Sequence, residues 1–174
     1  GAVSPRLLNE DGSIQLQGSI LSRGMSSSNK VRETSFITAA AMMTRRNLYL
    51  ELGGLDENYF FYNEDLDFCK QVRNRGDKVS IFPSAEVLHF GGISTKTRSA
   101  AAVLDGYLGG LYYSQKFYPG LLHYFYRVLL WIDLIPRSMI HISFALFSRR
   151  HKELLKSYMA ILKATITGQF IRKR

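Results

Sequence analysis

The sequence predicts an α/β fold that is followed by a wholly helical extension. Strand and helix patterns alternate over residues 1–98, whereas a long helical periodicity with many aromatic residues takes over after Ser99. The charge changes at the same point: residues 1–98 carry 12 basic and 11 acidic side chains, and residues 99–174 carry 11 and 3. The net charge therefore rises from +1 to +8. We expect two parts, 1–98 and 99–174.

The first elements are indicated by alternation and by turn residues. Residues 2–8 and 13–16 predict two strands of a hairpin around the turn at 9–12. The Ser- and Gly-rich stretch 17–34 predicts a surface loop, with a lid role as the alternative. The small apolar run 35–43 is typical of a strand buried on both faces, and Thr44 is expected to cap a helix over 45–52. Gly53 and Gly54 would close that helix.

The next elements follow the same logic. Asn63 is a favourable N-cap for a helix over 64–75, which Gly76 ends. Residues 78–82 and 85–89 predict strand segments on either side of Pro83. Beyond Ser99, the clearest helix covers 151–170. Its apolar stripe comprises Leu154, Leu155, Tyr158, Ile161, Leu162 and Ile166.

Several classes of protein can be set aside. The single cysteine, Cys69, excludes a disulfide framework, and no Cys/His cluster has the spacing of a zinc site. The longest apolar region, 121–147, is interrupted by charged residues and Pro136, so a simple transmembrane segment is not expected. The sequence starts at Gly1 with no signal-peptide pattern, and we expect a fragment of a longer chain.

The densest group of acidic residues lies at 63–67, directly after the aromatic run 59–62. Carboxylates in the first turn of a helix can simply complement the helix dipole, for about 0.3–1 kcal/mol each. The functional alternative is a general base, Asp65 with Glu64 beside it, in a cleft with an aromatic wall that includes Tyr62. Asp67 is expected to be structural or to face a bound substrate.

His89 follows Asp65 by 24 positions, which allows the chain to return to its starting point. The helix carries the chain away by roughly 18 Å, and a strand covers that distance in about six residues. We therefore expect His89 and Asp65 to face one pocket. The following turn offers Gly91 and Gly92 for close backbone approach, and Ser94 and Thr95 as hydroxyl donors to phosphate oxygens.

The order of several segments resembles the C-terminal half of family-2 glycosyltransferases, particularly the rhamnosyltransferase-like branch. The segments are GAVSPRLLNEDGSIQ at 1–15, TAAAMMTRR at 38–46, GGLDE at 53–57, FFYNEDLDFC at 60–69 and VLHFGGIST at 87–95. The resemblance covers about residues 1–98. It implies the C-terminal portion of a GT-A (Rossmann-like) domain and an inverting transfer of a sugar, possibly rhamnose, from a nucleotide-sugar donor.

The resemblance also implies roles for individual residues. The Glu-Asp pair of the family supplies the catalytic base, which corresponds to Asp65, and the histidine corresponds to a ligand of a divalent metal, Mg²⁺ or Mn²⁺, at His89. Relatives carry a nucleotide-binding half and an Asp-X-Asp metal motif upstream of the segment that matches Gly1. We therefore expect the chain alone to lack a complete donor site and to be inactive. The acceptor would be a growing, lipid-linked cell-surface glycan in a bacterium.

The basic helical part has three interpretations. Basic side chains interleaved with Trp131, Tyr124 and Phe125 suit a helix that lies on an anionic membrane surface, at the cytoplasmic face of the cell membrane. Packing against another part of the protein must account for some of the apolar residues. Nucleic-acid binding ranks last, because no such motif occurs and the apolar content is high. The rival to the enzyme is a non-catalytic module that tethers a partner to the membrane.

Overall fold

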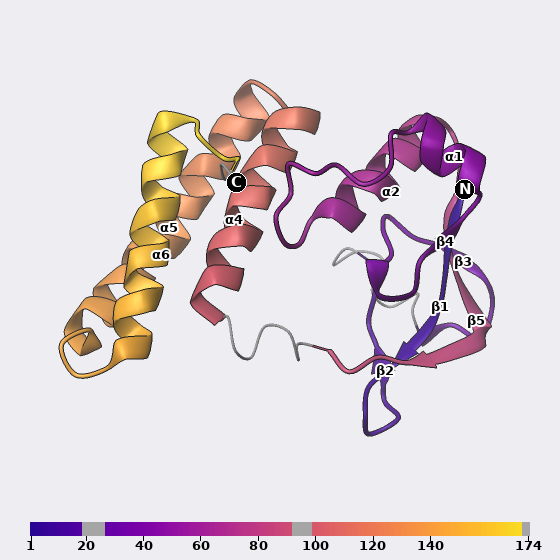
Figure 1. Ribbon diagram of the computed structural model, residues 1–174, viewed down its shortest axis with the longest axis horizontal. Helices are drawn as coiled ribbons and strands as arrows, with labels where there is room; N and C mark the ends of the chain where they lie inside the picture. Colours follow the sequence, from indigo (N-terminus) through magenta and orange to yellow (C-terminus); the bar gives the residue numbers. More distant parts are fainter. Residues whose placement is uncertain (19–26, 92–98, 172–174) are drawn as a thin grey trace. The chain divides into compact units, whose positions relative to one another are not determined.

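A mixed sheet organises the first part of the chain in the computed structural model, which describes residues 1–18, 27–91 and 99–171 (Figure 1). Strand β1 is paired in parallel with β5 and antiparallel with β2 and β4, and β3 pairs antiparallel with β5. The strands are β1 (Ala2–Leu8), β2 (Ile14–Gln15), β3 (Arg32–Glu33), β4 (Met43–Thr44) and β5 (Val79–Leu88). The predicted α/β class and the predicted hairpin are confirmed.

Strand β5 contains the break that Pro83 predicts. Pro5 of β1 pairs with Phe82, but the next residue, Arg6, pairs with Glu86. Three residues, 83–85, therefore have no partner on β1, because a proline has no N–H to donate to the ladder and is accommodated at a bulge. The second half of β5 is exposed, in contrast to its first half.

Two expectations about residues 35–44 are wrong. The run 35–43 is not a buried strand: it holds a short 3-10 turn, η2 (Ala39–Ala41), and then β4. Thr38 starts this turn, since its side chain accepts from the Ala40 N–H. Thr44 does not cap the following helix, because its hydroxyl donates to the Gly1 carbonyl at 3.0 Å and Arg45 occupies the N-cap position.

Two helices complete the first part. Helix α1 (Arg46–Glu51) is followed by Gly53 at φ 79°, and α2 (Glu64–Asn74) by Gly76 at φ 90°, so both helices end at the predicted left-handed glycines. The predicted loop 17–34, for which a lid role is the alternative, contains one short strand, β3, and its residues 19–26 lie outside the described residues.

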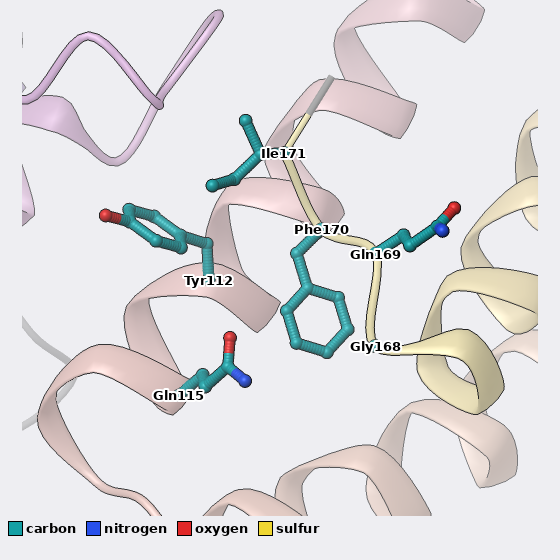
Figure 2. A pocket seen from close by; sticks show the side chains of 6 residues that line it. All are labelled: Tyr112, Gln115, Gly168, Gln169, Phe170 and Ile171. Atoms are coloured by element: carbon teal, nitrogen blue, oxygen red, sulfur yellow. The ribbon is translucent and has the colours of Figure 1, made fainter. Parts of the chain in front are cut away.

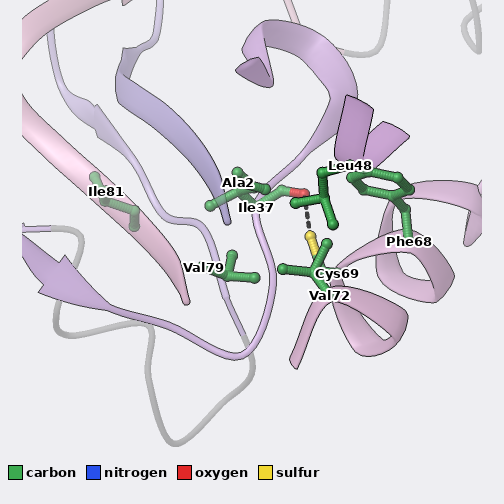
Figure 3. Packing of buried hydrophobic residues seen from close by; sticks show 8 residues of the cluster. All are labelled: Ala2, Ile37, Leu48, Phe68, Cys69, Val72, Val79 and Ile81. Atoms are coloured by element: carbon green, nitrogen blue, oxygen red, sulfur yellow. Dashed lines mark hydrogen bonds between the residues drawn. The ribbon is translucent and has the colours of Figure 1, made fainter. Parts of the chain in front are cut away.

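The core of the first part joins α2 to the start of β1 and β5 (Figure 3). Phe68, Cys69 and Val72 project from α2 into this core. The other members are Ala2, Ile37, Leu48, Val79 and Ile81. Each large apolar side chain buried in this way contributes about 1.5–3 kcal/mol. The Cys69 thiol lies 3.8 Å from the Ile37 carbonyl oxygen, and burial raises the pKa of the thiol to about 11.

The described residues divide into two compact units, each with its own core. The sheet unit contains residues 1–56 and 64–93, and the helical unit contains 57–63 and 94–174. The helices of the second unit are α4 (Ser99–Phe117), α5 (Leu121–Phe144) and α6 (Arg149–Thr167). The helical character predicted after Ser99 is therefore confirmed over the described part of that stretch.

The core of the helical unit forms where the three helices meet. Leu111 of α4, Leu134 of α5 and Ile161 of α6 are among its fully buried members. One member of the predicted stripe on α6 lies elsewhere: Ile166 is 67% exposed. In the part of the chain that the structure describes, no helix is long and apolar enough to cross a membrane.

Candidate functional site

The chain enters α2 through two left-handed residues. Tyr62 has φ 67° and Asn63 has φ 72°, a backbone region that non-glycine residues rarely adopt. Asparagine tolerates this region better than other residues, and here its Nδ2 also donates to the Gly106 carbonyl at 3.0 Å. Such strain costs on the order of 1–3 kcal/mol and clusters at functional sites. Asn63 therefore precedes α2 in a left-handed conformation and is not an extended N-cap residue.

Both oxygens of the Asp65 carboxylate accept hydrogen bonds from backbone N–H groups. Oδ1 accepts from Leu66 at 2.7 Å, and Oδ2 accepts from Ala39 at 3.2 Å. The second bond ties the first turn of α2 to the 3-10 turn at Ala39. The half-buried carboxylate is thus held in one orientation, as a positioned base requires.

A buried glutamine connects this region to the middle of β1. Oε1 of Gln17 accepts from the Thr38 N–H at 3.3 Å and from the Ser4 hydroxyl at 3.1 Å. Nε2 of Gln17 donates to the Pro5 carbonyl at 3.0 Å. Through Thr38 and Ala39, Asp65 is therefore anchored at the level of Ser4 and Pro5.

The carboxylate of Glu64 is less well stabilised than the carboxylate of Asp65. Its Oε2 atom is buried and has no hydrogen-bond partner among the described residues. Burial raises the pKa of the Glu64 carboxyl, a hydrogen bond from its own backbone N–H opposes this, and the nearby charge of Asp65 adds to the rise. The two neighbouring acids therefore lie in different environments, one fixed by hydrogen bonds and one partly desolvated.

His89 follows β5 and is held by the hairpin of β1 and β2. Its N–H donates to the Leu8 carbonyl at 2.9 Å, and its Nδ1 lies 2.5 Å from Oε1 of Gln15. Because the amide oxygen of Gln15 can only accept, the proton of this contact lies on Nδ1, which leaves Nε2 as the acceptor in the neutral ring. Nε2 is thus the nitrogen that could accept a proton or bind a cation.

Asp65 and His89 lie at different levels of the sheet. No hydrogen bond or ion pair joins their side chains in the structure as described. The contacts of Asp65 lead to Pro5, whereas His89 is bonded to Leu8, and three residues of extended strand span about 10 Å. A pocket shared by the two residues stays a prediction, with a substrate rather than a direct contact between them.

Of the remaining predicted site residues, the structure describes Tyr62 and Gly91. Tyr62 is 47% exposed and packs edge-on against Phe61, with ring centroids 4.4 Å apart. Gly91 donates its N–H to the His89 carbonyl at 2.8 Å, and a Cβ atom there would lie 2.9 Å from Nε2 of Gln15. Gly92, Ser94 and Thr95 lie outside the described residues.

The sequence analysis did not identify the two glutamines that organise this region. Gln15 positions His89, and Gln17 connects Thr38 to β1. They stand two residues apart after the hairpin turn, at the end of β2 and just beyond it, a spacing that places side chains on the same face of an extended chain. That alternation was the available signal, because polar side chains repeated on one face of a short strand indicate a hydrogen-bonding role.

The described residues do not form a metal site on their own. Nowhere in residues 1–18, 27–91 and 99–171 do three or more His, Cys, Asp or Glu side chains gather in a way that could hold a metal ion. His89 can offer one ligand at most through Nε2, so the divalent metal stays a prediction.

The helical unit has a hollow of about 410 Å³ between α4 and the segment after α6 (Figure 2). Phe170 of this segment is buried and packs edge-on against His123. The six described lining residues are Tyr112, Gln115, Gly168, Gln169, Phe170 and Ile171, and none carries a charge, a thiol or an imidazole. The hollow therefore offers less chemistry than the start of α2.

Comparison with known proteins gives a partial and distant similarity. Over 64 residues the chain is 36% identical to proteins from two strains of Mycobacterium tuberculosis, both described as N-acetylglucosaminyl-diphospho-decaprenol L-rhamnosyltransferase. The match covers 37% of this chain and 21% of the length of each relative. No protein-family model matches the chain. The similarity indicates a relationship to a glycosyltransferase and no more.

Proposed function

We propose that the chain carries the acceptor-activating part of an inverting glycosyltransferase, with Asp65 as the general base. The position of Asp65 supports this proposal best, because a half-buried carboxylate is held by two backbone N–H groups at the start of α2. The resemblance of this segment to family-2 glycosyltransferases and the similarity to rhamnosyltransferases agree with it. The donor would be a nucleotide-sugar, with L-rhamnose the first sugar to test.

The proposed chemistry is one displacement at the anomeric carbon. Asp65 takes the proton from an acceptor hydroxyl as the hydroxyl oxygen attacks that carbon, and the bond to the departing nucleoside diphosphate breaks. Glu64 lies beside the base, where burial raises the pKa of its carboxyl. The acceptor would be a sugar hydroxyl of a lipid-linked glycan, since the relatives are named for N-acetylglucosaminyl-diphospho-decaprenol. We place this reaction at the inner face of the cell membrane as part of the same proposal.

The replacement Asp65→Asn tests this proposal in the intact natural protein. An amide oxygen can still accept from the Ala39 N–H, but an amide cannot take a proton from a hydroxyl. We expect sugar transfer to a lipid-linked N-acetylglucosamine acceptor to fall by at least about 100-fold, the usual contribution of a general base. Transfer is measured with radiolabelled nucleotide-rhamnose, and the melting temperature should change little.

The matched control is Glu51→Gln on α1. It is an acid-to-amide change at an exposed carboxylate that forms an ion pair with Arg75. This variant should transfer sugar at the normal rate. Equal transfer by the Asp65→Asn protein and by the unmodified protein would reject the base assignment and favour the alternative, a non-catalytic module that tethers a partner to the membrane.

A further inference from the structure

One side of α5 is covered with exposed apolar side chains. Ile132, at the centre of the helix, is 66% exposed, and the neighbouring positions on the same side are exposed as well. We call this set the α5 face. Its members are Leu121, Leu122, Tyr124, Phe125, Val128, Leu129, Trp131, Ile132, Ile135, Met139, Ile140 and Ile142.

Helical geometry places the α5 face opposite the core. At about 100° per residue, its members fall within about half of the helix circumference. The buried positions Leu130, Leu134 and Ser138 occupy the other side of α5. The charged residues of α5, Arg127, Asp133 and Arg137, also fall outside the face by this spacing. The α5 face is therefore an uncharged surface along the length of a 24-residue helix.

A row of lysines runs along α6. Lys152, Lys156 and Lys163 are separated by four and seven residues, so they share one side of this helix, and all three are exposed. The exposed residues Met159 and Ile166 flank this row by the same spacing. We call the three residues the lysine row.

The α5 face continues onto α6 at a groove of about 390 Å³. Trp131 and Val128 of the face line this groove together with Ile166 of α6. The indole N–H of Trp131 donates to the Thr165 hydroxyl at 2.8 Å, which joins the two helices at this edge. The uncharged face thus meets the side of α6 that carries the lysine row.

The turn between α5 and α6 extends the same surface. Leu146 and Phe147 are 90% and 87% exposed, the highest values among the large apolar residues described. They line a hollow of about 470 Å³ whose charged lining residues are Arg149, Lys152, Glu153 and Lys156. Two highly exposed apolar side chains therefore lie beside three cations, of which Arg149 is paired with Glu153.

The acidic residues of the helical part do not neutralise this surface. Asp105 is buried, Asp133 accepts from Arg137 and from the Tyr107 hydroxyl, and Glu153 accepts from Arg149. The lysine row therefore supplies three of the positive charges that give residues 99–174 their net charge of +8. A matching partner must supply both an apolar layer and a dense layer of negative charge.

We propose that the α5 face docks flat on an anionic lipid surface, with the lysine row at the level of the lipid phosphates. A bilayer offers hydrocarbon and phosphate at adjacent depths, and interfacial helices bury their apolar side about 5–10 Å into this boundary. An uncharged side along the whole of α5 next to a row of cations suits a helix that lies on the surface. This inference does not depend on the proposed sugar transfer.

Binding to vesicles tests the inference with the 174-residue protein itself. We expect it to float with vesicles that contain phosphatidylglycerol, and to bind vesicles of phosphatidylcholine alone more weakly. The protein has one tryptophan, Trp131, which lies in the α5 face. Its fluorescence should shift to the blue on binding and be quenched by brominated acyl chains, which reports insertion of this face directly.

Variants separate the two parts of the surface. Ile132→Glu should lower the partition coefficient at least about tenfold, because a charge would enter the apolar layer. The matched control, Leu50→Glu, places the same charge on a 57% exposed leucine of α1 and should bind normally. Replacing the lysine row by glutamine should weaken binding to anionic vesicles by up to about fivefold per residue, and should not affect neutral vesicles.

The same experiments contain the outcomes that would overturn the inference. Circular dichroism first checks that each variant stays helical. Absence of vesicle binding, or binding that Ile132→Glu and Leu50→Glu reduce equally, would overturn it. A dimer in solution that Ile132→Glu dissociates, without any vesicle binding, would instead assign the α5 face to a second copy of the chain.

Discussion

At the scale of single residues, Glu64 is a carboxyl group whose ionisation the fold opposes. Its Oε2 atom is buried without a partner, and burial raises its pKa above the ordinary value of 4.5. Between the unfolded and the folded pKa, the folded protein binds more protons than the unfolded protein. Stability therefore falls as the pH rises through this window and stays lower above the folded pKa.

The variant Glu64→Gln should remove this pH dependence. We expect it to be more stable than the unmodified protein at pH 7, by about 1 kcal/mol, and to lose this advantage near pH 4, where Glu64 is protonated. Urea unfolding at several pH values measures the effect. Glu10→Gln, in an exposed turn, is the control and should leave the pH profile unchanged. A constant difference between the Glu64→Gln and unmodified proteins at all pH values would contradict the explanation.

The sequence identifies some residues of the candidate site and misses others for a physical reason. Asp65 and His89 stand out because their residue types and spacing are local properties of the chain. The bond from Ala39 to Asp65 joins residues 26 positions apart, and the bond from Gln15 to His89 joins residues 74 apart. Such pairs depend on strand register, which a periodicity pattern does not determine.

At the scale of elements, helix α4 contains two glycines that face the segment 57–63 and differ in the space available for a side chain. A Cβ atom on Gly106 would make an ordinary contact with Tyr62 at 3.6 Å. A Cβ atom on Gly109 would lie 2.5 Å from Nδ2 of Asn63 and 3.3 Å from the Tyr59 ring. The Asn63 side chain cannot move away without losing its bond to the Gly106 carbonyl. Of these two glycines, only Gly109 is therefore required for close packing against the segment 57–63.

Alanine substitutions should have opposite effects at these two positions. Gly106→Ala should stabilise the protein by up to about 1 kcal/mol, because alanine is the better helix former. Gly109→Ala should destabilise it, because overpacking of about 1–3 kcal/mol exceeds that gain. Thermal unfolding followed by circular dichroism at the helix band compares them. A higher melting temperature for Gly109→Ala than for Gly106→Ala would show that Asn63 is not held in place.

A helix or strand can be predicted from the sequence when the residues that determine its ends are its immediate neighbours in the chain. Helix α2 and strand β5 begin and end within a residue or two of the predicted positions, because Gly76 and Pro83 act on their immediate neighbours. The predicted strand at 35–43 failed because only Ile37 in that run is fully buried, and the Thr38 side chain stabilises a turn instead. Small apolar residues fit both structures, so the pattern alone could not distinguish them.

At the scale of the whole molecule, the exposed side of Ile166 shows the same limit. A helical stripe indicates which residues can face a core, but the angular width of the contact depends on the neighbouring helix. Tyr158, Ile161 and Leu162 face the core, whereas Ile166 lies at the groove with Trp131. The sequence predicts the existence of the helical part, and its packed and open faces require the structure.

The two compact units should unfold as separate cooperative units, because their cores share no described residue. The chain provides one natural reporter for each unit. Cys69, fully buried and with a pKa of about 11, can react with a thiol reagent only after the sheet unit opens. Trp131, bonded to Thr165, reports the contact of α5 with α6 in the helical unit.

We therefore expect the urea midpoints of Cys69 labelling and Trp131 fluorescence to differ, and each to respond to its own core. Ile161→Ala should destabilise the helical unit by about 2–5 kcal/mol and lower the Trp131 midpoint, while the Cys69 midpoint stays in place. Ile81→Ala, in the core of the sheet unit, should lower the Cys69 midpoint alone. If either replacement moved both midpoints together, the units would form one cooperative structure, because a loss confined to one core can reach the other reporter only through coupling between them.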